Sequence, residues 1–104
     1  MKSRYIIATI TGVSLSLMGI VGAQAYSGEN LAKHAKITMT EAQGIALKAR
    51  PGTITDEELE KERGGSGLRY SFDIKGTDKV IYEVGVDAQT GAVLENDKES
   101  THPD

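Results

Sequence analysis

The strongest constraint on the fold is a pair of segments, residues 68–75 and 80–87, in which apolar and polar side chains alternate. Successive side chains of a strand point to opposite faces of a sheet, so this pattern is typical of half-buried antiparallel strands. The two segments therefore predict a hairpin in a sheet with one dry face and one wet face. The residues predicted on the dry face are Leu68, Tyr70, Phe72, Ile74, Val80, Tyr82, Val84 and Val86.

The loop of this hairpin must contain an odd number of residues, because directly opposed residues of two strands share a face. A three-residue loop at residues 76–78 pairs Ile74 with Val80, whereas a five-residue loop pairs Ile74 with Tyr82. We favour the shorter loop, although it opposes two lysines at an exposed end of the hairpin.

A helix is predicted over residues 39–50. Thr38 and Glu41 have the spacing of a capping box, and Pro51 with Gly52 stops the helix. The face that packs on the sheet is predicted to be narrow and rich in alanine, and it contains Ala42, Ile45, Ala46 and Ala49. This helix can therefore approach the sheet closely.

A second pattern begins in the second strand of the predicted hairpin. The strand that ends at Tyr82–Ala88, the turn at Thr90-Gly91 and the strand that starts at Val93-Leu94 resemble the PepSY domain, a small module of secreted and membrane-associated bacterial proteins. The resemblance covers Thr38 to Glu95. It implies an α+β fold in which one N-terminal helix packs on a small antiparallel sheet of three to four strands. The polar residues 96–104 beyond it are predicted to be a disordered tail.

Two interpretations remain open for residues 53–62. Thr55 and Glu58 match another capping box, which favours a short helix, whereas the resemblance implies a strand in this place. Ile54 and Leu59 are five apart, so a regular strand would place them on opposite faces. We favour an irregular or bulged edge strand, whose acidic side chains would protect an exposed sheet edge.

The N-terminus has the three parts of a secretory signal. Lys2 and Arg4 precede an uncharged, largely apolar run over residues 5–21, and the small-x-small triplet of residues 23–25 follows. We predict cleavage after Ala25, because the run is short for a membrane-spanning helix, with a retained anchor as the alternative. The mature chain would begin with a polar leader, residues 26–37, and would be periplasmic or secreted, with no membrane association after cleavage.

Composition excludes several classes of function. The chain has a formal net charge of −3 and no cysteine. Thiol catalysis, cysteine metal sites and disulfides are therefore excluded, and the small core must stabilise the fold. An acidic chain without a basic cluster is also not expected to bind nucleic acid or anionic lipid surfaces.

No catalytic or metal-binding motif is recognisable. Asp73 and Glu83 are predicted to be neighbours on the wet face and could share a proton or bind a cation, but we favour an ordinary solvated face. The acidic run of residues 56–62 lacks the spacing of a calcium loop, and His34 and His102 lie outside the expected core. We expect no enzyme activity, no cofactor and no metal. The aromatic side chains Tyr70, Phe72 and Tyr82 are predicted to be core residues rather than a ligand platform.

The resemblance implies a non-catalytic module. PepSY domains occur in propeptides of secreted metallopeptidases, and no peptidase domain follows Asp104, so any restraint of a peptidase is expected to act in trans. We therefore expect an exported binding module whose protein partner, a secreted or envelope peptidase, binds to the wet face or to a sheet edge. The alternative is a cell-envelope sensor of a small ligand or divalent cation. The candidate partner-binding residues are Arg69, Ser71, Asp73, Glu83, Ile54, Glu58 and Glu60.

Overall fold

The computed structural model describes residues 25–99, and α1 spans Met39–Ala49 within them. The predicted capping box is present: the Glu41 amide donates to Thr38 Oγ1 at 3.0 Å, and the Thr38 amide donates to Glu41 Oε1 at 2.8 Å. Ala42 and Ala46 are fully buried on the face that packs on the sheet. The predicted helix is confirmed.

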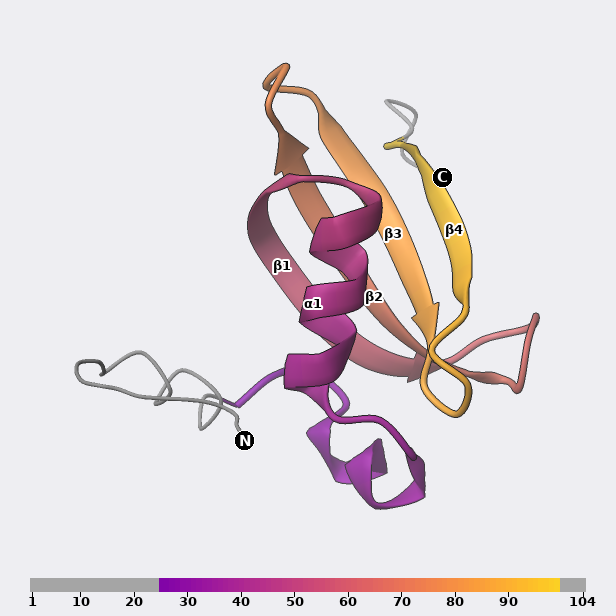
Figure 1. Ribbon diagram of the computed structural model, residues 1–104. Helices are drawn as coiled ribbons and strands as arrows, with labels where there is room; N and C mark the ends of the chain where they lie inside the picture. Colours follow the sequence, from indigo (N-terminus) through magenta and orange to yellow (C-terminus); the bar gives the residue numbers. More distant parts are fainter. Residues whose placement is uncertain (1–24, 100–104) are drawn as a thin grey trace, which may run out of the picture.

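Four strands form one antiparallel sheet in the described part of the chain, in the spatial order β1-β2-β3-β4. Figure 1 shows α1 lying across one face of this sheet. The strands are β1 (Gly52–Lys61), β2 (Leu68–Gly76), β3 (Ile81–Asp87) and β4 (Val93–Lys98). The core lies between α1 and the sheet, and its buried members are Ala42, Ala46, Leu59, Leu68, Tyr70, Phe72, Ile74, Val84, Val86 and Ala88. The α+β fold with a helix on an antiparallel sheet is confirmed.

Residues 53–61 belong to a bulged edge strand, as the favoured interpretation predicted. The register of β1 against β2 shifts between Ile54, which pairs with Ile74, and Asp56, which pairs with Asp73. The extra residue, Thr55, donates its hydroxyl to the Asp73 carbonyl at 3.3 Å. Because of this bulge, Ile54 and Leu59 both pack against the core although they are five residues apart.

The favoured register of the central hairpin is wrong, and the alternative register is observed. Ile74 pairs with Tyr82, and the Gly76 amide donates to the Val80 carbonyl at 2.8 Å. The turn therefore lies at residues 77–79, where Lys79 adopts a left-handed φ of 70°. Asp78 stabilises this turn, because its carboxylate accepts hydrogen bonds from the Val80 amide at 3.0 Å and the Tyr82 hydroxyl at 2.6 Å. The opposition of two lysines is thereby avoided.

The turn after β3 is organised by Asp87, whose side chain is 1 % exposed. Its Oδ1 atom accepts hydrogen bonds from the amides of Gln89 at 2.8 Å and Thr90 at 3.1 Å, as expected for a capping side chain. Gly91 adopts the positive φ predicted for it, at 81°. Asp87 also accepts hydrogen bonds from the Ser66 amide at 2.6 Å and the Ser66 hydroxyl at 2.8 Å, so it ties the glycine-rich loop to this turn.

The last strand is longer than predicted. β4 continues to Lys98, so residues 96–98 are not part of a disordered tail, and residues 100–104 lie outside the described residues. A tertiary contact explains the extension. Asn96 accepts a hydrogen bond from Arg50 Nε at 3.0 Å and donates to the Ala49 carbonyl at 3.3 Å, which fastens β4 to the end of α1. Arg50 also lies 3.7 Å from the centre of the Tyr82 ring.

The segment expected to be a polar leader is packed on the domain. A short 3-10 helix, η2 (Glu29–His34), precedes α1, and apolar side chains on both sides of it contact the core. The Tyr70 hydroxyl donates to the Ile37 carbonyl at 2.7 Å, and the amides of Lys36 and Ile37 donate to the Ala88 carbonyl. The predicted signal lies outside the described residues except for Ala25. Within residues 25–99, no helix is long and apolar enough to span a membrane.

Candidate functional site: the acidic open face

The face of the sheet opposite α1 is dominated by carboxylates. Side chains that alternate with the core residues point to this face, and the strand register places acidic residues of all four strands beside one another. We call this surface the acidic face. Its carboxylate-bearing residues are Asp56, Glu58, Glu60, Glu62, Asp73, Glu83, Glu95, Asp97 and Glu99.

One row of the acidic face crosses the whole sheet. Asp56 of β1 pairs with Asp73 of β2, Asp73 pairs with Glu83 of β3, and Glu83 pairs with Asp97 of β4. Like charges directly opposite one another destabilise a sheet. This row therefore costs free energy of folding at neutral pH.

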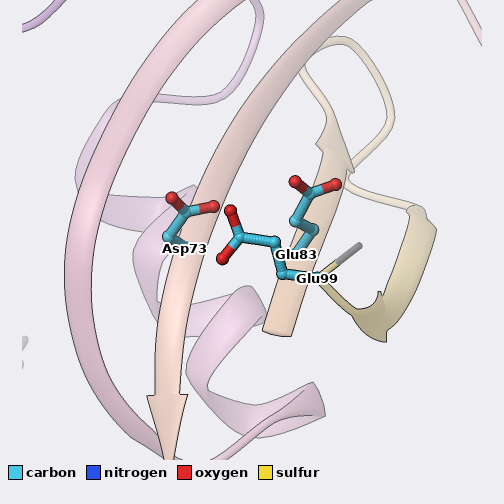
Figure 2. A group of neighbouring side chains, drawn as sticks. All are labelled: Asp73, Glu83 and Glu99. Carbon is cyan, nitrogen blue, oxygen red and sulfur yellow. The ribbon is translucent and has the colours of Figure 1, made fainter. Parts of the chain in front are cut away.

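Three carboxylates of this surface, those of Asp73, Glu83 and Glu99, come together as one group. Figure 2 shows these three side chains gathered on one side of the sheet. One carboxylate oxygen from each residue lies within 4.8 Å of the others. Burial and the Glu99 and Asp56 charges raise the pKa of Asp73, while burial and the Glu95 and Asp73 charges raise the pKa of Glu83. These three carboxylates are the described groups best placed to hold a divalent cation.

A neighbouring hollow of about 170 Å³ is lined by carboxylates of β1 and by residues of the three other strands. The Ser71 hydroxyl donates to Glu60 Oε2 at 2.7 Å, so Ser71 is oriented by Glu60. Burial and the charges of Glu60 and Asp56 raise the pKa of Glu58. The hollow therefore presents partly desolvated negative charge.

Arg69 does not belong to the solvated part of this face, contrary to expectation. Its side chain lies across Gly85 and is 9 % exposed, because a glycine at that position leaves room for the aliphatic stem. Arg69 Nη1 is 3.6 Å from Glu62 and 3.4 Å from Glu95, and Nη2 donates to the Arg63 carbonyl at 3.0 Å. Arg69 therefore connects β2 with β4 and with the segment that follows β1.

The other candidate surface is the outer edge of β1. Ile54 is half-buried against the core, whereas Glu58 and Glu60 point to the acidic face. Glu57 points to the opposite side, where Gln43 Nε2 of α1 donates to Glu57 Oε1 at 2.7 Å. Ser27 forms a parallel bridge with Glu58, so the N-terminal segment covers part of this edge.

Sequence reasoning placed Ser71, Asp73 and Glu83 on the wet face and assigned Glu58 and Glu60 to a sheet edge. The structure brings all five residues together around one hollow. Sequence reasoning missed the contribution of β4, namely Glu95, Asp97 and Glu99, because the polar end of β4 resembles a disordered tail. The alternation of Leu94, Asn96 and Lys98 with these acidic residues was the available signal. His34 contributes its backbone carbonyl to Gln89, and His102 lies outside the described residues.

Of three comparisons with known proteins, one identifies a family for this chain. No curated protein and no solved structure matches the chain. The profile of the PepSY family, described as "Peptidase propeptide and YPEB domain", matches residues 36–97, which include α1, the first three strands and all but the last residue of β4. This match extends over more than half of the sequence, and the helix-on-sheet architecture agrees with it. The chain therefore belongs to the PepSY family.

Proposed function

We propose that this protein is an exported, non-catalytic binding module that regulates a secreted or envelope peptidase in trans. PepSY domains are generally propeptide-like or inhibitor-like modules, and the family description names peptidase propeptides. The predicted signal at residues 1–25 supports export to the periplasm or the medium.

The observation that carries this proposal is the acidic face. Helix α1 covers one side of the sheet, whereas no described element packs over the row from Asp56 to Asp97. The charges on this face lower the stability of the domain and are not needed for the core. A surface of this kind is suited to a partner with complementary charge.

Photocrosslinking in the native cell envelope tests the proposal. The mature chain would carry a photoreactive residue at Ser71 on the acidic face, at Thr53 near the edge, or at Gly44 as a control. Gly44 is exposed on α1, and a side chain there would meet no other atom within 4 Å. We expect a peptidase adduct from Ser71 or Thr53 and none from Gly44. Equal adducts from all three positions, or no protein adduct, would contradict the proposal.

A divalent-cation sensor is the second candidate, and the group of Asp73, Glu83 and Glu99 favours it. If this function is correct, Ca²⁺ or Mg²⁺ should raise the melting temperature more than monovalent salt of equal ionic strength. Glu83→Gln should remove the difference, whereas Glu29→Gln, an exposed change in η2, should leave it intact. Equal effects of divalent and monovalent salt would exclude this candidate.

A further inference from the structure

The outer edge of β1 is divided into two halves. At its C-terminal half, the Leu59 amide donates to the Ser27 carbonyl at 2.9 Å, and Ser27 forms a parallel bridge with Glu58. Gly28 allows this close approach, because a Cβ at that position would collide with the Leu59 carbonyl. The protein therefore already pairs an extended segment with β1 at this half of the edge.

The N-terminal half of the same edge, Thr53–Glu57, has no such partner in residues 25–99. It borders a groove of about 440 Å³ between the N-terminal segment, α1 and β1. The residues that line the groove are Ala25, Tyr26, Ser27, Gln43, Ile54, Thr55, Asp56 and Glu57. The unpaired half of the edge is thus accompanied by a groove that can accept side chains of an added strand.

The chemistry of the groove combines apolar and acidic groups. Ile54 and Tyr26 are half-buried and contact the core. Asp56 and Glu57 supply negative charge on opposite sides of the strand, since Asp56 pairs across the acidic face and Glu57 bonds to Gln43 of α1. An occupant therefore gains from apolar side chains near Ile54 and from basic side chains near Asp56.

A second copy of this chain is a poor occupant. Pairing of two β1 edges would bring Asp56, Glu57 and Glu58 of both copies together. The other sheet edge, β4, carries Glu95 and Asp97 and would also be repelled. Acidic residues on an edge strand oppose self-association by this mechanism.

We propose that the unpaired half of the β1 edge, Thr53–Glu57, binds an extended segment of another protein in which basic and apolar residues alternate, by adding that segment as a strand. This inference rests on the proposed binding function and names the chemistry of its partner. The backbone of the segment supplies hydrogen bonds to β1, and its lysine or arginine side chains lie beside Asp56 and the adjoining acidic face.

A titration followed by heteronuclear NMR tests the inference. The probe is a short, capped synthetic peptide in which lysine and valine alternate, and the protein is the mature chain, Tyr26–Asp104. We expect amide shifts centred on Thr53–Glu57 and the groove. N-methylation of alternate peptide bonds in the probe should abolish these shifts, because it removes backbone donors while charge is preserved.

Charge-reversed variants provide the matched control. Asp56 and Asp97 lie at opposite ends of one row of the acidic face, and both are exposed. Asp56→Lys should weaken binding of the probe about fivefold, whereas Asp97→Lys should change the dissociation constant less than twofold, roughly. Equal losses in the two variants, or equal binding of the N-methylated probe, would show attraction by net charge alone and would overturn the inference. If the edge fails these tests while Ser71 still crosslinks a peptidase, the proposed function stands and only this inference falls.

Discussion

Replacement of Asp87 should be among the most damaging single polar substitutions in this domain. The side chain is 1 % exposed, and its Oδ1 atom accepts from the Gln89 amide, the Thr90 amide and the Ser66 hydroxyl. Its Oδ2 atom accepts from the Ser66 amide at 2.6 Å. Burial alone would raise the pKa of Asp87, but these hydrogen bonds outweigh it and lower the pKa to about 2.

The two oxygens have different partners, so substitutions at this network should form an ordered series. Asp87→Ala leaves every donor without its acceptor and should cost about 4 kcal/mol, a large part of the roughly 4–11 kcal/mol expected for a domain of this size. Asp87→Asn keeps an acceptor at Oδ1 but directs an amide group at the Ser66 amide, and should cost about 2 kcal/mol. Ser66→Ala loses one hydroxyl bond and should cost about 1 kcal/mol.

Urea denaturation of the mature chain, followed by circular dichroism, measures this series. The wild type should also lose stability as the pH falls from about 4 toward about 2, because the folded pKa lies below the unfolded value. Asp87→Asn should lack this acid-induced loss. A cost below about 1 kcal/mol for Asp87→Ala, or unchanged acid sensitivity in Asp87→Asn, would refute the role assigned to the carboxylate.

Three further predictions concern the core, the helix end and the acidic face. Phe72 is 1 % exposed, so Phe72→Ala should cost about 3–5 kcal/mol and largely unfold the domain, and a melt like that of the wild type would contradict its place in the core. Arg50→Ala should cost about 1–2 kcal/mol by urea denaturation through loss of its stacking on Tyr82 and its hydrogen bond to β4, whereas Arg50→Lys should recover only part of this. The raised pKa values of Asp73 and Glu83 mean that the folded state holds protons more tightly than the unfolded state, so these groups should lower stability as the pH rises above about 4. Added salt should raise the melting temperature at pH 7, and Asp73→Asn should reduce this effect; a melting temperature independent of salt would exclude the repulsion.

The elements that sequence reasoning predicted correctly are those with local signals. The capping box of Thr38 and Glu41 defines the start of α1, and strict alternation defines the core side of β2 and most of β3. The spacing of Ile54 and Leu59 indicated the bulge, because a regular strand could not bury both side chains. In each case a rule acting over a few residues determines the structure.

The features that were predicted wrongly depend on side-chain contacts that the alternation of apolar and polar residues does not encode. Two hairpin registers satisfy the same alternation, and the choice between them follows from the hydrogen bonds of Asp78 and the left-handed Lys79. Arg69 is buried because its side chain lies across Gly85 of the neighbouring strand, which alternation within one strand does not reveal. The end of β4 is held by Asn96 and the end of α1, which are far apart in the sequence.

The contrast between Asp87, which is buried, and Asp73 with Glu83, which are partly buried, bears on the proposed function. The Asp87 carboxylate accepts hydrogen bonds at both of its oxygens, so its negative charge contributes to stability. Asp73 and Glu83 are paired across β2 and β3 and lie beside further carboxylates, so their charges oppose folding. Arg69, the cation buried at this face, is already engaged by Glu62 and Glu95 and lies away from that row. Neutral variants of the row should fold at least as well, and under the proposed function its charge serves the binding of a partner. A stabilised Asp73→Asn variant that loses the crosslinked partner would show that the charge serves recognition at a cost in stability.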